Sequence, residues 1–334
     1  MHFIPLGWPK KKVKVQKAKI IFKEKIYYLG KFFKRNINVI IDLKKKQVEK
    51  KWYINKTLEK KTVSIFLTYK FHNFFFKFPI SFLKFVFFFK NKKKIKLKKN
   101  EIILFGPFSW NYAHQIHEFL IRIAYLKKKK YNTIYLPNHL KKILFSKIYK
   151  KIFSDKEFKF FHPDETIEFS NAAYLSHIEN RFVNSEFKKT LQFLRDSVQK
   201  QKIRKKFQYI LVSRQNAKSR VLLNENLLFA KLSKYGFKKI IFEKLSIDKQ
   251  IELTKNCKIM VGFHGAGISN CAYMKKNSLV IEIANKYYPH PHFELFCRCL
   301  NIKYRRFFCV KNYKNLDGTC DISQIINFIK SKIN

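Results

Sequence analysis

The sequence predicts an α/β fold built on parallel sheets, and three stretches indicate it. Residues 257–283 have the pattern of a buried strand, a glycine turn, the first turns of a helix and a second strand. Residues 207–257 alternate between strand and helix, and residues 101–123 begin with a strand that leads into a helix. This order is typical of parallel sheets. The 334 residues suffice for one large or two medium domains.

The glycine turn, His264-Gly265-Ala266-Gly267, is the first candidate site. Glycines let the backbone approach a ligand closely, and the N–H groups at the start of a helix favour an anion such as phosphate. His264 adds an imidazole that can donate a hydrogen bond or a proton to that anion. For the glycines alone, a packing turn in an ordinary α/β domain is the alternative.

Two arginines follow the predicted strand at residues 207–212. Open α/β sheets bind ligands in the crevice at the carboxyl ends of their strands, where Arg214 and Arg220 are expected. Two guanidinium groups there suit a diphosphate, because the planar fork binds phosphate oxygens in a fixed geometry. The alternative is a solvated basic loop.

A third candidate lies on the helix predicted after the strand at residues 101–106. His114, His117 and Glu118 share one face of this helix at spacings of three and four residues. Two imidazoles and a carboxylate suit either metal binding or acid–base chemistry. A solvated polar face is the alternative, but the position after a strand and a Gly-Pro turn favours a site.

The remaining elements are predicted from apolar runs and capping residues. Further strands are predicted at residues 20–22, 26–29, 39–41, 63–69, 132–136, 156–161 and 239–242. Further helices are predicted at residues 140–153, 187–206 and 225–235, and from Ser246 towards Cys257. Asn224 and Ser246 are predicted N-caps, and Gly236 ends a helix. Residues 91–100, with six lysines, are predicted to be a solvated loop or hairpin.

The phenylalanine-rich residues 71–89 have two interpretations. One is a membrane-facing surface on which aromatic side chains enter the bilayer and lysines contact anionic headgroups. The other is a buried strand or helix. Pro79 favours burial, because proline interrupts a long amphipathic helix.

Composition limits the class of protein. Half of the net charge of +50 lies in the first 100 residues, and such basicity suggests nucleic acid or an anionic membrane. Joint enrichment in Lys, Phe, Ile, Asn and Tyr indicates a coding bias, so the charge carries little weight. No stretch approaches the ~20 apolar residues of a membrane span, and the start lacks the features of a signal peptide, so we expect a cytoplasmic protein. The six cysteines fit no zinc motif, and we expect reduced thiols.

Four separated blocks together resemble glycosyltransferase family 61. The first is Asn111-x-x-His114-x-x-x-Glu118, and the others contain Ser213, Arg214, Ser219, Arg220, Asn224 and Glu225, residues 261–270, and residues 280–283. The resemblance covers about residues 101–320. It departs from the family pattern at Ala113, Ile121 and Phe263, none of which removes a chemically active group.

The resemblance implies a GT-B fold, in which two Rossmann-like domains face each other across a cleft. We therefore expect an acceptor-side domain at residues 101–200 and a nucleotide-sugar domain at residues 201–334. Residues 1–100 are a basic, phenylalanine-rich entry region of unknown role, expected to be part of the acceptor domain. The family is inverting and generally works without a metal ion, and this chain lacks an Asp-x-Asp pair that would hold one. The nucleotide-sugar is then a substrate, and no cofactor or metal is expected.

The resemblance also implies roles for the site residues. Glu118 is the first candidate for the base that deprotonates the acceptor, followed by His114 and then His117. The leaving diphosphate would be stabilised by cationic side chains and turn N–H groups, namely Arg214, Arg220, His264, Gly265, Ala266 and Gly267. Contacts with the nucleoside or sugar are expected from Asn111, Asn270 and Glu282. Glu282 would accept from the ribose hydroxyls, and Asn270 would either fix the turn or contact the sugar.

The expected partners are a nucleotide-sugar donor and a glycan or lipid-linked acceptor. The family suggests synthesis of surface polysaccharides such as capsule or lipopolysaccharide, with peripheral contact at the anionic inner face of a membrane. One alternative is a basic nucleic-acid-binding protein, although no motif of that class appears and no specific nucleic acid is expected. The other alternative is a non-catalytic relative that binds sugar nucleotides. The intact His264, Arg214 and Glu118 argue against it.

Overall fold

The computed structural model describes ten segments of the chain, namely residues 20–32, 35–42, 47–48, 93–106, 109–162, 165–175, 185–200, 208–288, 290–313 and 315–333. These segments fall into two compact units. The N-terminal unit comprises the described residues within 16–145 and 153–179, and the C-terminal unit those within 146–152 and 180–334. The domain boundaries and the GT-B arrangement drawn from the resemblance stay predictions. The predicted strand at residues 63–69 and the phenylalanine-rich residues 71–89 lie outside the described segments.

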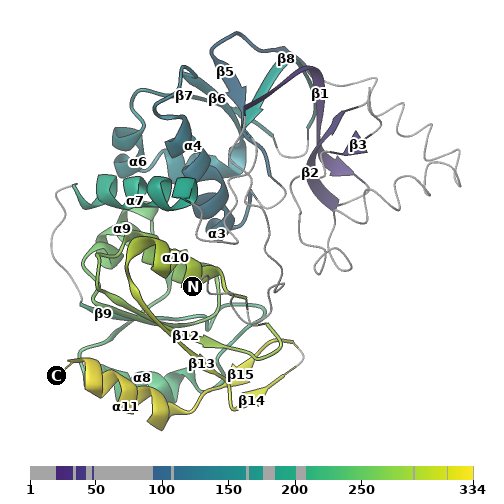
Figure 1. Cartoon of the computed structure of the whole chain (residues 1–334). Coiled ribbons are helices and arrows are strands. Elements are labelled where there is room, and N and C mark those ends of the chain that lie inside the picture. The colour runs from purple at the N-terminus through teal and green to yellow at the C-terminus, as the bar shows by residue number, and fades with distance from the viewer. Residues whose placement is uncertain are drawn as a thin grey trace, which may run out of the picture. The chain divides into compact units, whose positions relative to one another are not determined.

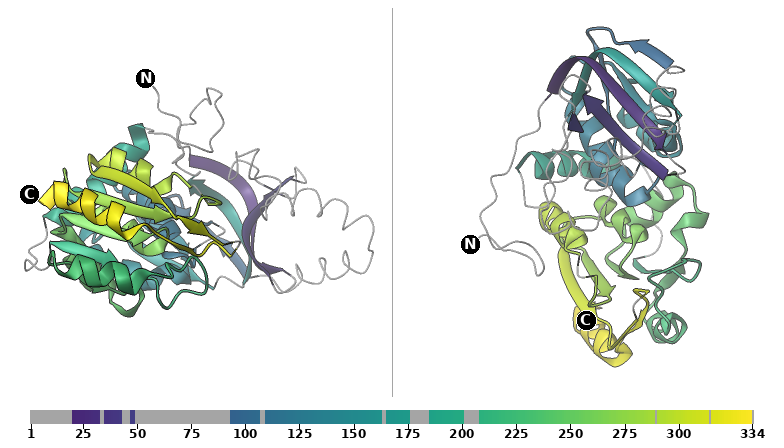
Figure 2. Two further views of the ribbon diagram at one scale, coloured as in Figure 1. Left: turned by 90° about the horizontal axis from the view of Figure 1, so that it is seen from below. Right: turned by 90° about the vertical axis from the view of Figure 1, so that its right-hand side faces the viewer.

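The N-terminal unit is built on one mixed sheet of eight strands (Figure 1). In sheet order these are β3 (Gln47–Val48), β2 (Arg35–Asp42), β1 (Ile20–Phe32), β8 (Thr166–Leu175), β5 (Glu101–Ile103), β6 (Thr133–Pro137) and β7 (Glu157–Phe161), while β4 (Lys93–Lys96) also pairs with β8. β1 pairs antiparallel with β2 and β8, and the purple β1 and β2 lie side by side in Figure 2. Pairings among β4 to β8 are parallel, which confirms the α/β class.

Two predictions about the strands of this unit are wrong. Residues 20–22 and 26–29 are not separate strands but parts of β1, which pairs with β8 from Ile20 to Leu29. Residues 91–100 are not a simple loop or hairpin, because they contain β4 and its partner is β8 rather than the adjacent β5. Lysines are tolerated in β4 because most of its side chains are exposed, so that their charges stay in water.

The helical segments of the N-terminal unit follow β5 and β6. After β5 come α3 (Tyr112–His114), the π-helix η2 (Gln115–Leu120) and α4 (Ile121–Leu126). After β6 come η3 (Asn138–Leu140) and α5 (Lys141–Leu144). The prediction of one helix over residues 140–153 is wrong. The helix ends after α5, and a separate helix, α6 (Lys147–Ile152), follows in the C-terminal unit. Asp248 accepts from the N–H groups of Lys147 and Ile148 at 2.9 and 3.1 Å, so a distant carboxylate fixes the start of α6.

The C-terminal unit contains a five-stranded parallel sheet. Its order is β10 (Lys238–Ile240), β9 (Tyr209–Val212), β11 (Ile259–Phe263), β12 (Leu279–Ala284) and β13 (Lys303–Phe308). Counted from β9, this is the order 2-1-3-4-5 of a doubly wound sheet. The strand order therefore reverses between β9 and β11, which are neighbours. In such sheets this reversal marks the usual ligand crevice.

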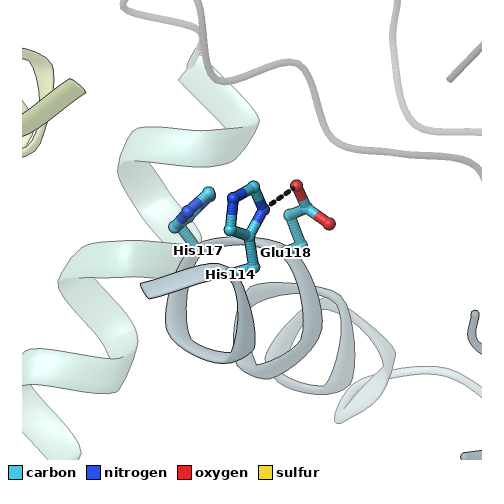
Figure 3. Close-up of side chains that lie close together, drawn as sticks. All are labelled: His114, His117 and Glu118. Atoms are coloured by element: carbon cyan, nitrogen blue, oxygen red, sulfur yellow. Dashed lines mark hydrogen bonds and ion pairs between the residues drawn. The ribbon is translucent and has the colours of Figure 1, made fainter. Parts of the chain in front are cut away.

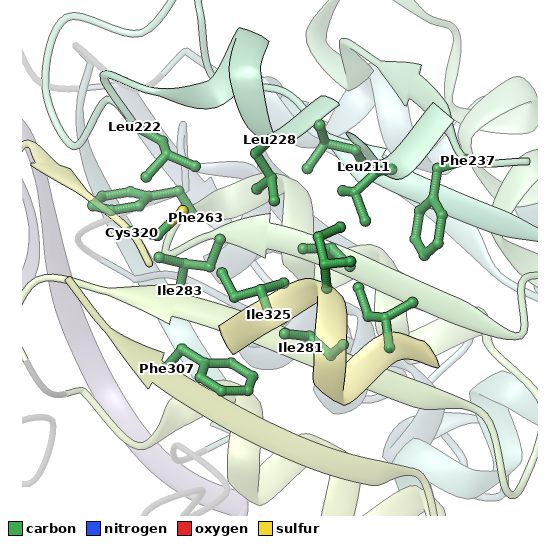
Figure 4. Packing of buried hydrophobic residues seen from close by; sticks show 14 of the residues in the cluster. Leu211, Leu222, Leu228, Phe237, Phe263, Ile281, Ile283, Phe307, Cys320 and Ile325 are labelled. Carbon is green, nitrogen blue, oxygen red and sulfur yellow. The ribbon is translucent and has the colours of Figure 1, made fainter. Parts of the chain in front are cut away.

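Helices cover both faces of this sheet. The helices of this unit that follow α6 are α7 (Ser185–Gln199), α8 (Glu225–Ser233), η4 (Phe242–Lys244), α9 (Ile247–Lys255), η5 (Ala266–Tyr273), α10 (His292–Leu300) and α11 (Ile322–Ile333). α8 and α11 lie on one face, and α9 and α10 lie on the other (Figure 1). Between the sheet and α8 and α11, side chains such as Leu211, Leu228, Ile281 and Ile325 pack into a buried core (Figure 4). A short hairpin of β14 (Lys311–Asn312) and β15 (Gly318–Thr319) follows β13.

The structure confirms some of the predicted helix ends of this unit and differs at others. Ser246 is confirmed as an N-cap, since its side chain accepts from the N–H of Lys249. Gly236 has the positive φ of 79° that suits a glycine at a helix end. Asn224 is the N-cap residue of α8 as predicted, but its side chain makes no capping bond and instead bonds the backbone of Cys320. The strand predicted at residues 239–242 also ends early, and Phe242 begins η4.

Two global expectations can be compared with the described residues. No helix among them is both long enough and apolar enough to cross a membrane. All six cysteines lie in described segments, and all are buried and outside any disulfide bond. The reduced state of these thiols stays a prediction.

Candidate functional site

The carboxyl ends of β9 and β11, where the strand order reverses, carry most of the predicted phosphate-binding residues. Arg214 follows β9, and the glycine turn of His264 to Gly267 follows β11. β9 and β11 pair in register from Tyr209 and Ile259, so their ends meet at one edge of the sheet. The topology alone therefore brings these residues together.

Arg214 lies directly against the glycine turn. A Cβ atom built on Gly265 would be 1.9 Å from Nη1 of Arg214 and 2.6 Å from its Cζ, so the guanidinium occupies the space that a side chain would need. Its Nε donates to the carbonyl of Arg220 at 2.9 Å and its Nη2 to that of Ser219 at 3.0 Å. Burial, reinforced by the charge of Arg220, lowers the pKa of Arg214 to about 10, so the group remains a cation at neutral pH.

The loop that carries both arginines is fixed at its two ends. Glu225 accepts from the hydroxyl of Ser213 at 2.5 Å and from the N–H of Arg214 at 3.0 Å. At the other end, Asp317 accepts from the N–H of Val221 at 2.7 Å. These bonds hold the loop conformation before any ligand binds, which lowers the ordering cost of binding.

Arg220 and His264 share an aromatic neighbour. The guanidinium of Arg220 lies 5.5 Å from the ring centroid of Tyr288, within the range of a cation–π interaction. The same ring lies 5.1 Å from the imidazole of His264, edge to face. Arg220 and His264 are therefore grouped around one tyrosine.

His264 is held by a fully buried carboxylate. Its Nδ1 is hydrogen-bonded to Glu282, whose side chain has no exposed surface. Glu282 also accepts from the hydroxyl of Tyr304 and from Arg306, at 3.1 Å from Nε and 2.9 Å from Nη2. Burial raises the pKa of Glu282, but His264, Arg306 and Tyr304 outweigh it, so the net pKa lies below the ordinary value. With Nδ1 held in this way, Nε2 is the nitrogen available to a ligand.

The burial of Glu282 favours a role other than the predicted contact with ribose. Contact with ribose hydroxyls needs an exposed carboxylate, whereas this one is enclosed and bonded by three side chains. Its position instead suits the orientation of His264. Tyr304 and Arg306 were not among the predicted site residues. They reach Glu282 because β12 and β13 pair with Glu282 opposite Arg306, and no local sequence pattern specifies that register.

The rest of the turn is fixed from within. The amide nitrogen of Asn270, which is fully buried, donates to the carbonyl of Gly267 at 3.0 Å and to Gln250 at 3.2 Å. Of its two predicted roles, fixing the turn matches these bonds. Gly267 lies against the sheet, since a Cβ there would be 2.7 Å from Cγ1 of Val212. Ala266 is half-buried and begins η5.

The N-terminal unit holds a separate group, here called the imidazole–carboxylate cluster, of His114, His117 and Glu118 (Figure 3). Nδ1 of His114 and Oε1 of Glu118 lie 2.7 Å apart, and the two imidazole centroids lie 4.7 Å apart. His117 is buried, while His114 and Glu118 are partly exposed. The three possible ligand atoms lie within 4.8 Å of one another, so the cluster suits a divalent metal as well as proton transfer.

Local bonds hold the segment that carries this cluster. The side chain of Asn111 accepts from the N–H of Ala113 at 3.0 Å and so caps the helix, which is a structural use of a residue predicted to contact the ligand. Gln115 donates to the carbonyl of Ser109 at 2.7 Å. Gly106, three residues after β5, leaves room for the cluster, because a Cβ there would lie 3.3 Å from Oε2 of Glu118. The predicted site residues thus form two groups, each within one unit.

Comparison with known proteins agrees with these motifs. The sequence model of the glycosyltransferase 61 family matches residues 112–281, about half of the chain. A curated relative, the EGF domain-specific O-linked N-acetylglucosamine transferase of Drosophila melanogaster, is 31% identical over 91 residues. Those residues are 26% of this chain and 17% of the relative, so the chain matches about a sixth of that protein's length.

Proposed function

This chain belongs to the glycosyltransferase 61 family, and on that premise we propose that it is an inverting, metal-independent glycosyltransferase. It would move a sugar from a nucleotide-sugar to a hydroxyl of a glycan or lipid-linked acceptor. The observation that carries the proposal is the His264–Glu282 pair beside Arg214, at the point where the order of a parallel sheet reverses. That arrangement supplies a fixed cation and an oriented imidazole where a diphosphate is expected to bind.

The proposed reaction is one in-line displacement. The acceptor oxygen attacks the anomeric carbon from the face opposite the nucleotide, while the bond from that carbon to the diphosphate oxygen breaks. A base takes the proton of the acceptor hydroxyl, and the nucleoside diphosphate leaves with the bonding electron pair. Charge therefore develops on the diphosphate, where cationic and N–H donors lower the barrier most.

The C-terminal unit supports the leaving-group half of this reaction. Arg214 remains protonated at neutral pH and is preorganised by two backbone carbonyls, so it needs little reorganisation to bind a phosphate oxygen. With both ring nitrogens protonated, Nε2 of His264 donates to a second oxygen while Nδ1 donates to Glu282. Arg220 and the N–H groups of residues 265–267 would add further donors.

The imidazole–carboxylate cluster supports the acceptor half. We assign the base to Glu118 first, to His114 second and to His117 third. The 2.7 Å bond between Glu118 and His114 lets the pair share the proton taken from the acceptor. Two Rossmann-like domains facing across a cleft would unite this cluster with the donor groups, and that GT-B arrangement is part of the proposal.

The donor groups support the proposed metal independence. The C-terminal unit offers guanidinium, imidazole and backbone N–H groups, which neutralise a diphosphate without a bridging cation. The cluster His114, His117 and Glu118 has the composition of a metal site, so the same geometry permits a test of this point.

The biological setting is proposed from the family. Synthesis of a surface polysaccharide such as capsule or lipopolysaccharide, in the cytoplasm and at the inner face of a membrane, agrees with the net charge of +50. The transfer of N-acetylglucosamine named for the Drosophila relative places nucleotide-activated N-acetylglucosamine among the first donors to test.

A ligand panel tests the proposal. Purified protein is scanned for thermal stabilisation and hydrolysis with UDP-, GDP-, CMP- and dTDP-sugars, each with and without EDTA. We expect one nucleotide to raise the melting temperature without any effect of EDTA. Arg214→Ala should abolish that shift, whereas the matched variant Arg298→Ala should keep it, because Arg298 is half-exposed and pairs with Glu294 on α10. A shift that EDTA removes would contradict metal independence, and salt-sensitive binding to nucleic acid alone would contradict the activity.

A further inference from the structure

Arg122 of α4 is a cation with no exposed surface. Three of its nitrogens point to backbone carbonyls. Nε donates to Glu118 at 2.7 Å, Nη2 to Phe105 at 2.8 Å and Nη1 to Leu175 at 3.5 Å. Its guanidinium also lies 4.8 Å from the ring centroid of Phe119. One side chain thus joins the helix, the segment after β5 and the last residue of β8.

Burial of this charge is costly, so its retention calls for a reason. Burial lowers the pKa of Arg122 to about 10, and the nearby carboxylate of Glu118 partly offsets that effect. A buried charge generally stabilises a protein less than a well-packed apolar side chain of similar volume. Filling this space alone would therefore be achieved as well by methionine or leucine. What an apolar residue cannot supply is three directed donors.

Those donors act at an irregular point of the helix. Residues Gln115–Leu120 form a π-helix, whose hydrogen bonds are offset by one residue from those of an α-helix. A turn of this kind is less stable than the α-helical alternative, and it changes the direction in which earlier side chains point relative to later ones. Arg122 bonds the carbonyl of Glu118 within that turn and ties it to Phe105.

The segment that Arg122 bonds also lies next to the carboxylate of Glu118. Phe105, which accepts from Arg122, precedes Gly106, and Gly106 is the residue that leaves space for Oε2 of Glu118. A shift of the helix relative to this segment would therefore move Glu118 and change its 2.7 Å bond to His114.

We infer that Arg122 is a positioning residue, which holds the π-helical turn and thereby keeps Glu118 and His114 in the geometry needed for proton transfer. The inference rests on the proposed function for its effect on catalysis. Arg122 itself does not contact the reacting atoms. A misplacement of about 1 Å at a reacting group can lower a rate about 100-fold.

The test compares Arg122→Met and Arg122→Lys with Arg195→Met. Arg195 is a matched control, because it is also almost fully buried and donates to a backbone carbonyl, that of Leu300 at 2.7 Å, but lies in the C-terminal unit. Both Arg122 variants should lower kcat about 100-fold and leave the donor KM and the donor dissociation constant unchanged. Arg195→Met should lower the melting temperature without that selective loss of kcat. Should Arg122→Met fail to fold, Arg122→Lys decides, since it keeps the charge but replaces the planar fork of three separate nitrogens by a single nitrogen.

A second measurement separates this inference from the proposed reaction. Long-range ¹H–¹⁵N spectra of the histidine rings report the hydrogen bond at Nδ1 of His114 in the absence of substrate. We expect that signal to change in both Arg122 variants and to stay at its wild-type position in Arg195→Met. An unchanged His114 signal, or equal losses of kcat in the Arg122 and Arg195 variants, would overturn the positioning role. If the wild-type protein transfers no sugar, the proposed function fails while the spectra still decide the role of Arg122.

Discussion

His264 is hydrogen-bonded through Nδ1 to Glu282, a carboxylate with no exposed surface on the adjacent strand β12. Arg306 and Tyr304 bind the same carboxylate from β13. Orientation of the imidazole therefore depends on a buried ion cluster rather than on the glycine turn alone. This dependence makes the stability of the unit sensitive to pH.

The Glu282→Gln variant should be less stable than the wild type by about 3 kcal/mol at pH 7, because it leaves Arg306 without its buried counter-charge. The folded-state pKa of Glu282 is lowered, so its contribution is fully present above the unfolded value of about 4.5 and is lost as pH falls through the folded value. The stability difference between the two proteins should therefore shrink below about pH 4.5. Urea unfolding at pH 7 and in steps below pH 4.5 measures it, and a pH-independent difference would contradict the ionised cluster.

A methyl group added at Gly265 should have a different effect from one added at Gly267, because the two meet different neighbours. In Gly265→Ala the new Cβ displaces the guanidinium of Arg214, the mobile end of a long side chain, and the φ of 176° at Gly265 suits any residue. We expect about 10- to 100-fold weaker donor binding, since a charged hydrogen bond is lost, with stability changed by less than about 0.5 kcal/mol.

Gly267→Ala provides the contrast. Its Cβ meets Cγ1 of Val212, a buried and stiff side chain within the sheet, at 2.7 Å. Overpacking of this kind costs about 1–3 kcal/mol. Gly265→Ala should therefore lower mainly the donor affinity measured by calorimetry, whereas Gly267→Ala should lower mainly the stability measured by urea unfolding. The assignment of Arg214 to the donor site would be wrong if Gly265→Ala bound donor as tightly as the wild type.

The sequence predicts the C-terminal unit better than the N-terminal one, and the reason is physical. In the parallel unit each strand is followed by its own helix, so local signals such as the Ser246 cap and Gly236 mark the boundaries. β1 of the other unit pairs with β8, where Ile20 lies opposite Leu175. A pairing between residues so far apart has no local sequence signature. The position of the glycine turn after β11 was predictable because its signals are local. The partners of Glu282 were missed because they come from another strand.

Asn224 allows a test of whether a residue that resembles a local helix cap instead acts through a distant contact. Its side chain donates to the carbonyl of Cys320 at 2.8 Å and accepts from the N–H of Cys320 at 3.1 Å, so it ties α8 to the residue after β15. Asn224→Ala should cost about 1–2 kcal/mol in urea unfolding through the loss of two bonds. Serine is a good N-cap but lacks an amide donor, so Asn224→Ser should not restore stability. If Asn224→Ser were as stable as the wild type, Asn224 would act as a helix cap rather than through Cys320.

The order of bases in the N-terminal unit can be resolved by three matched substitutions. Glu118→Gln, His114→Gln and His117→Gln each remove one member of the imidazole–carboxylate cluster while keeping a polar side chain of similar reach. If Glu118 takes the acceptor proton, Glu118→Gln should lower kcat by about 10²- to 10⁴-fold, the usual range for a lost general base. Donor affinity should stay constant, because the residues proposed to bind the diphosphate lie in the other unit.

His114→Gln should then have a smaller effect, since it removes the 2.7 Å partner of Glu118 rather than the base. His117, which is buried beside His114, should matter least to kcat and most to stability. Steady-state transfer assays with calorimetric donor titration, each with and without EDTA, measure all three variants. Equal losses in all three, together with inhibition of the wild type by EDTA, would instead identify the cluster as a set of metal ligands, because a metal site fails when any one ligand is removed.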